Sequence, residues 1–169
     1  MPSSRSTRRC FSGPPLSGLA RVAAFKLPRR MIEETFSIFR SCGDNQRECQ
    51  VYWASPWSAL QTLTEVVHPK HYSGRYGLSI DGDWISRFWN ELSDRGLGVR
   101  IQVHTHPEEA FHSATDDTFP LLFDPGFLSL VIPDFAMGPV GFRDAYLTEI
   151  QPDGTWRQVD ITSRIIVDE

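Results

Sequence analysis

The sequence has few cysteines, and they do not form a recognisable framework. Cys10, Cys42 and Cys49 are the only three in 169 residues. Because the number is odd and no Cys-x-x-Cys pair occurs, a disulfide scaffold and a four-cysteine zinc site are both disfavoured. A reducing compartment fits this cysteine usage better, so we expect a cytoplasmic protein.

Long apolar runs and a strong charge imbalance are also missing. No run approaches the roughly 20 apolar residues that a membrane span needs, so we expect no membrane partner. The formal net charge is −4 and the pI is near 5.7, which does not favour nucleic-acid binding. Hydrophobic residues make up 40% of the chain. This content supports an ordinary hydrophobic core.

The chain divides near residue 18. Residues 1–18 lack hydrophobic periodicity and include several prolines and glycines, so we interpret them as a flexible N-terminal tail. No linker or internal repeat interrupts the remainder. Residues 19–169 are therefore predicted to form a single domain.

The hydrophobic pattern of this domain is mixed. Apolar residues recur at helical spacing over 29–43 and 81–96, and Gly43 and Gly96 suit the ends of those helices. Strand patterns occupy 19–28, 48–55, 60–69, 98–106 and 126–135, with a loop or short strand over 71–80 and a hairpin over 143–161. The order of these segments predicts an α/β fold, with a mixed β-sheet flanked by helices.

The stretch "VHTHPEEAFHSATDD", residues 103–117, holds three of the five histidines. Because alternate residues of a strand share a face, His104 and His106 should project to the same side of a strand that Pro107 ends. This pair is compatible with a histidine-rich polar loop and with a metal site.

A metal site needs a third ligand besides the two histidines, whereas a polar loop does not. Two imidazoles and a carboxylate form a good ligand set for Zn²⁺ with one position left open. Asp116 and Asp117 both lie a short loop away. Ser113 precedes Asp116 by three residues, as an N-cap residue precedes N3, so the two residues could open a short helix aimed at the metal.

The whole pattern resembles a known motif. "HTHP", then five residues, then Ser113-Ala-Thr-Asp116 is similar to the HxHP and SxxD elements of the JAMM (JAB/MPN+) metalloproteases. Glu48, in "GDNQRECQVYWAS", resembles the glutamate that this family carries on the strand after its first helix. The resemblance covers roughly residues 20–150. It implies an MPN/JAB (cytidine-deaminase-like) fold of the bacterial stand-alone type.

The resemblance also implies roles for five residues. His104, His106 and Asp116 would hold one Zn²⁺ per chain, with Asp116 preferred to Asp117. Glu48 would act as general base, and Ser113 would stabilise the oxyanion.

The implied activity is hydrolysis of a peptide or isopeptide bond C-terminal to a ubiquitin-like protein, in deconjugation or precursor processing. The implied partners are that protein or its conjugates, with activating and conjugating enzymes of the same system. Some systems of this kind serve antiphage defence.

Two alternatives remain open at this point. One is a non-catalytic MPN scaffold, although all five motif positions are filled. The other is a JAMM peptidase or amidase that acts on a sulfur-carrier protein or a small substrate. In every case we expect substrate contacts from residues 108–117 and from the segment 56–80.

Other residues receive structural interpretations. His112 is interpreted as a loop residue packed beside Phe111. His68 and His71 have no apparent acidic or cysteine partner, so we interpret them as loop residues. Cys49 is expected to be a buried strand cysteine and not a nucleophile, since no activating base is apparent.

Two further groups of residues are interpreted in the same way. The aromatic stripe over 84–92 is predicted to be core. Glu108 and Glu109 are interpreted as solvated charges that could steer a basic substrate tail.

Overall fold

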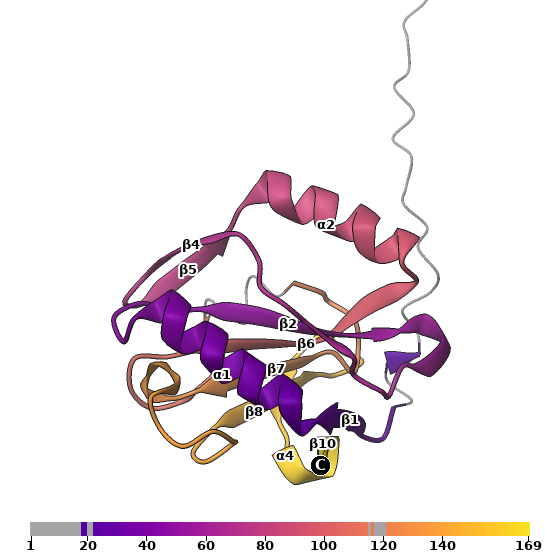
Figure 1. Cartoon of the computed structure of the whole chain (residues 1–169). Coiled ribbons are helices and arrows are strands. Elements are labelled where there is room, and N and C mark those ends of the chain that lie inside the picture. The colour runs from indigo at the N-terminus through magenta and orange to yellow at the C-terminus, as the bar shows by residue number, and fades with distance from the viewer. Residues whose placement is uncertain (1–17, 20–21, 115, 117–120) are drawn as a thin grey trace, which may run out of the picture.

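The computed structural model describes residues 18–19, 22–114, 116 and 121–169. Nearly all of the expected tail, residues 1–17, lies outside this range. At the centre is a six-stranded sheet with strand order β3-β2-β6-β7-β8-β9 (Figure 1). Its strands are β2 (Gln50–Pro56), β3 (Glu65–Val67), β6 (Leu97–Thr105), β7 (Leu128–Ile132), β8 (Tyr146–Ile150) and β9 (Trp156–Gln158).

The sheet is mixed. β6 and β7 run parallel, and every other neighbouring pair is antiparallel. β7 is buried along its whole length, as its continuous apolar sequence predicts. The remaining elements are β1 (Phe25–Pro28), α1 (Arg29–Gly43), η2 (Trp57–Ala59), β4 (His71–Gly74), β5 (Gly77–Ile80), α2 (Gly82–Asp94), η3 (Asp134–Ala136), α4 (Ile161–Arg164) and β10 (Ile165–Asp168).

The expected fold class is confirmed: helices flank a mixed sheet. The helix predicted over 29–43 has the bounds of α1, and the hairpin predicted over 143–161 is β8 and β9. The strand predicted over 60–69 is too long, because only Glu65–Val67 pair with β2. The segment 71–80 forms a complete hairpin of β4 and β5. The C-terminal strand β10 was not anticipated; three of its four residues are exposed, so its sequence carries no clear alternation.

The two long helices cover opposite faces of the sheet, and two adjacent residues of β2 show why. The Trp53 indole donates to Thr35 Oγ1 of α1 at 2.9 Å. The Tyr52 ring stacks on Phe88 of α2, with 5.9 Å between ring centroids. Since successive side chains of a strand point to opposite faces, α1 and α2 lie on opposite sides, as Figure 1 also shows.

Strand β6 presents apolar side chains to the α1 face and polar side chains to the α2 face. Val51 and Val103 are cross-strand partners, as are Gln50 and His104. The polar residues of β6 are nevertheless buried, because α2 and the neighbouring loops cover them. The α2 face is therefore a buried polar surface.

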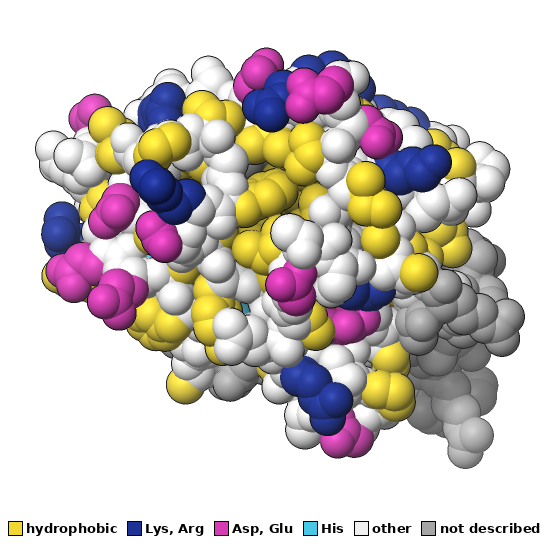
Figure 2. Space-filling view, turned by 90° about the horizontal axis from the view of Figure 1, so that it is seen from below, with side chains coloured by type: hydrophobic (Ala, Val, Ile, Leu, Met, Phe, Trp, Pro, Cys, Tyr) yellow, Lys and Arg dark blue, Asp and Glu magenta, His cyan; other side chains and the backbone are white. Residues whose placement is uncertain are grey.

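Figure 2 shows the molecule from below, where hydrophobic side chains gather near the middle and acidic and basic side chains stand around them. Within the described residues, no helix has both the length and the apolar character that a membrane span requires.

Candidate metal centre

Three of the expected ligands converge at the end of β6. His104 and His106 have 2% and 5% of their surface exposed. Their Nε2 atoms lie 3.3 Å apart. Asp116 Oδ1 lies 3.3 Å from His104 Nε2, and Asp116 Oδ2 lies 3.8 Å from His106 Nε2. The three side chains thus aim one donor atom each at a common point.

Asp116 is held in place by Ser113. The Ser113 backbone N–H and hydroxyl both donate to Asp116 Oδ2, each at 2.8 Å. In return, the Asp116 N–H donates to Ser113 Oγ at 3.2 Å. These reciprocal contacts have the form of a capping box, as the spacing of the two residues predicted. Asp117, the alternative ligand, lies outside the described residues.

The donor set fits a zinc ion. Tetrahedral coordination with ligand distances of about 2.0–2.1 Å places neighbouring ligand atoms about 3.3 Å apart. The 3.3 Å between the two Nε2 atoms and the 3.3 Å from His104 Nε2 to Asp116 Oδ1 match this spacing closely. Imidazole nitrogen and carboxylate oxygen are ligands that zinc accepts, and three protein ligands leave a fourth position for a reactant.

The protonation states also suit a cation. Burial, together with the charge of His104, lowers the pKa of His106 to about 4, so its ring is neutral at pH 7. Burial alone would raise the pKa of Asp116, but the hydrogen bond and charge of His104 and the bonds from Ser113 hold it well below its usual range. A neutral imidazole and an ionised carboxylate are the forms that bind metal.

Glu48 lies in the same cleft as these ligands. It comes two residues before β2, and Gln50 of that strand is the cross-strand partner of His104. Only 8% of its surface is exposed. Burial raises its pKa from 4.5 to about 7; His104 opposes this shift and Asp116 adds to it. A carboxylate with a pKa near neutrality is suited to accept and release a proton.

The cleft has a volume of about 930 Å³. One wall is the hairpin segment 76–80, another is residues 107–111, and the floor is formed by polar residues of β2 and β6. Phe111 packs its ring against His106 at 4.7 Å and is 53% exposed. Both segments from which we expected substrate contacts therefore border the cleft.

Some of the structural interpretations hold only in part. His112 lies in a loop, as expected, and its ring also packs against Trp156 of β9, at 4.6 Å. The aromatic stripe of α2 is core only in part: Phe88 is buried, but Trp89 is half-buried and lines the cleft. The reason is that α2 covers the sheet at the edge of the cleft, so one flank of its apolar face borders open space.

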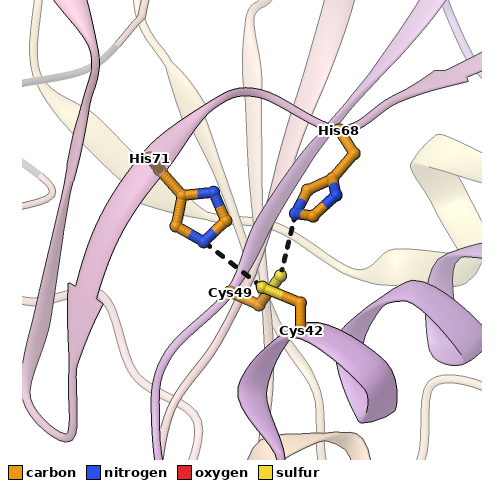
Figure 3. A group of neighbouring side chains, drawn as sticks. All are labelled: Cys42, Cys49, His68 and His71. Atoms are coloured by element: carbon orange, nitrogen blue, oxygen red, sulfur yellow. Dashed lines mark hydrogen bonds between the residues drawn. The ribbon is translucent and has the colours of Figure 1, made fainter.

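His68 lies in a loop, as expected, but His71 begins β4, and the expectation that neither has a cysteine partner is wrong. Their rings face the thiols of Cys42 and Cys49 (Figure 3). Cys49 is completely buried, as expected. Burial and the neighbouring Cys42 raise the pKa of its thiol, which argues against a nucleophile. This second cluster could not be found from sequence because α1, β2 and the 68–71 segment meet only in the folded chain.

Comparison with known proteins finds a relative that is named as a metalloprotease. The chain is 29% identical over 149 residues to the probable metalloprotease y4jG of Sinorhizobium fredii (strain NBRC 101917 / NGR234), covering 85% of this chain and 92% of that protein. No family model matches. The resemblance first seen in a few motif residues thus extends to a metalloprotease relative over most of the chain.

Two solved structures match the chain over most of its length. Protein DSY2949 from Desulfitobacterium hafniense has a TM-score of 0.61 at 19% identity, covering 86% of this chain and 93% of that chain. AF2198, a JAB1/MPN domain protein from Archaeoglobus fulgidus, has a TM-score of 0.49 at 12% identity, covering 85% and 98%. At such identities, the likeness to DSY2949 concerns the fold alone.

Proposed function

We infer that this chain is a metallopeptidase-type hydrolase of the JAMM kind, with Zn²⁺ as its metal. The observation that carries this inference is the meeting of four side chains in one cleft. His104, His106 and Asp116 point their donor atoms at one position, and Glu48 stands beside them with a pKa near 7. The similarity to a probable metalloprotease supports the same class.

Each residue then has a task in amide hydrolysis. His104, His106 and Asp116 hold the metal, which when bound supplies Lewis acidity and lowers the pKa of water to about 7. Glu48 takes the proton of the attacking water and passes it to the leaving amine. The Ser113 hydroxyl, which donates to Asp116 in the substrate-free cleft, donates to the developing oxyanion when substrate is bound.

We propose that the substrate is the extended C-terminal tail of a ubiquitin-like protein. The cleft is lined by β5, which among the described residues pairs only with β4, so its second edge is open to an added strand. Glu108 and Glu109 also border the cleft and favour a basic tail. Tyr76 and Phe111, which are 76% and 53% exposed, offer apolar contacts.

The proposed reaction is cleavage of the peptide or isopeptide bond after that tail. The partners would be the ubiquitin-like protein or its conjugates, together with the activating and conjugating enzymes that supply them. A role in an antiphage system is part of this proposal. The proposed cleavage is supported by the motif resemblance and by the residues that line the cleft, whereas the antiphage role is supported by the resemblance alone.

The two alternative functions differ from the proposed one either in the need for a metal site or in the substrate. A non-catalytic scaffold would not need a metal-ligand set with Glu48 beside it, and the presence of both disfavours this role. A peptidase or amidase for a sulfur-carrier protein or a small substrate would share the same chemistry, so only the choice of substrate separates it from the proposal.

The test uses ubiquitin-like proteins extended at the C-terminus by a short peptide, with a sulfur-carrier protein extended in the same way. The wild-type chain should release the peptide from the ubiquitin-like fusion. Glu48→Gln should lower kcat about 100-fold or more, whereas Glu33→Gln, the same change on the exposed face of α1, should not. Undiminished cleavage by Glu48→Gln would contradict the general-base role, and cleavage of the sulfur-carrier fusion alone would favour the alternative.

A further inference from the structure

A second group of potential metal ligands lies outside the proposed catalytic site. Cys42, Cys49, His68 and His71 each offer one ligand atom, and these four atoms all lie within 4.8 Å of one another. The four residues come from three parts of the chain: the last turn of α1, the segment just before β2, and residues 68–71 before and at the start of β4 (Figure 3).

The geometry of the group is that of a closed coordination shell. Cys42 Sγ lies 3.3 Å from His71 Nε2, and Cys49 Sγ lies 3.4 Å from His68 Nε2. Bonds of about 2.3 Å to sulfur and 2.0–2.1 Å to nitrogen, at tetrahedral angles, put sulfur and nitrogen about 3.6 Å apart. The observed separations are close to this value, so a small adjustment admits an ion at the centre.

One histidine is already oriented for coordination. His71 Nδ1 lies 2.9 Å from the carbonyl oxygen of Pro69. Because a carbonyl can only accept, Nδ1 carries the proton and Nε2 presents its lone pair toward Cys42. Metal-binding histidines are commonly held in this way, by a hydrogen bond from the nitrogen that does not bind the metal.

We propose that Cys42, Cys49, His68 and His71 form a structural zinc site. Two thiolates and two imidazoles in tetrahedral arrangement are a ligand set that selects zinc. All four positions are taken by protein, so this ion has no place for a reactant, in contrast to the three-ligand set of His104, His106 and Asp116.

The site would tie together the elements that place Glu48 and the cleft wall. Cys49 follows Glu48 directly, and the Glu48 N–H donates to the Gly74 carbonyl of β4 at 2.9 Å. His71 begins β4, whose partner β5 lines the cleft. An ion shared by Cys49 and His71 therefore fixes the hairpin against the segment before β2 that carries Glu48.

The experiment counts metals in the purified full chain by multi-element mass spectrometry. Because zinc is also expected at the first site, each site needs its own variants. We expect about two zinc ions per chain in the wild type. His104→Ala and His68→Ala should each reduce the count to about one, and the double variant should reduce it to about zero. His68 is exposed, so this change is less disruptive than replacing Cys49.

Cobalt substitution separates the sites without an activity measurement. Co²⁺ at a site with cysteine ligands gives a sulfur-to-cobalt charge-transfer band in the near ultraviolet. The band should be present in the wild type and in His104→Ala, weaker in Cys42→Ser, and absent when Cys42 and Cys49 are both replaced by serine. Cys10→Ser, the matched change of the third cysteine, should keep it.

Three results would overturn the proposal. They are a zinc count that does not change in His68→Ala, the absence of a charge-transfer band in folded wild type, and a disulfide between Cys42 and Cys49 in thiol titration. A His104→Ala variant that keeps its full zinc count would instead contradict the first site and leave the second intact.

Discussion

Replacing Glu48 by glutamine is expected to stabilise the fold while it lowers kcat about 100-fold or more. Glu48 is 8% exposed, and burial raises its pKa from 4.5 to about 7. Because the folded-state pKa lies above the unfolded one, the neutral carboxyl contributes fully below pH 4.5, and that contribution is lost as the pH rises through 7. Glutamine stays neutral at every pH, so it avoids the loss.

The magnitude follows from the same pKa values. A pKa difference of one unit between the folded and unfolded states corresponds to about 1.4 kcal/mol. The rise of the Glu48 pKa from 4.5 to about 7 therefore means that ionising Glu48 in the fold costs up to about 3 kcal/mol. The cleft is in contact with solvent, which reduces this to about 2 kcal/mol. Glu48→Gln should therefore raise the free energy of unfolding by about 2 kcal/mol at pH 8 and by almost nothing at pH 4.

The assay is urea denaturation of His106→Ala and of His106→Ala with Glu48→Gln, from pH 4 to pH 8. The shared background removes one ligand of the first site, so that bound metal does not lower the pKa of Glu48. Cys42, Cys49, His68 and His71 are left untouched. An equal difference at pH 4 and pH 8 would refute the reasoning, since the effect must come from ionisation.

Two other changes test how the site and its strand are built. Ser113→Ala removes the hydroxyl that donates to Asp116 and should weaken metal binding about 10-fold. Competition with a chelator measures the metal affinity. An unchanged affinity would contradict the role of Ser113 in positioning Asp116. Gly98→Ala places a Cβ 2.7 Å from the buried Arg100 guanidinium and should cost about 1–3 kcal/mol. Thermal unfolding measures this loss of stability. Gly82→Ala, the control, has open space around its Cβ position and should leave the stability unchanged.

The elements of the fold could be predicted to different degrees. The helix over 29–43 is set by local periodicity and was predicted with its observed bounds. The strand expected over 60–69 was overestimated, because its length depends on how far β2 extends beside it. β10 was missed, because its stability comes from pairing with β1, which lies 140 residues earlier in register.

The candidate site shows the same division. That His104 and His106 share a face follows from strand alternation, and the Ser113 contact with Asp116 follows from their spacing. The position of Glu48 beside them was implied only by resemblance. In the fold it results from the antiparallel pairing of Gln50 with His104.

The sequence by itself determined the local features of this protein: helical stripes, alternating strands and a motif whose ligands lie within 13 residues of one another. These follow from backbone periods that act over a few residues. Only the tertiary structure decided which distant side chains meet. Cys42 and Cys49 face His68 and His71 because α1, β2 and the hairpin of β4 and β5 pack at one end of the sheet. No local pattern encodes that meeting, since it depends on strand register and on chain closure over long separations.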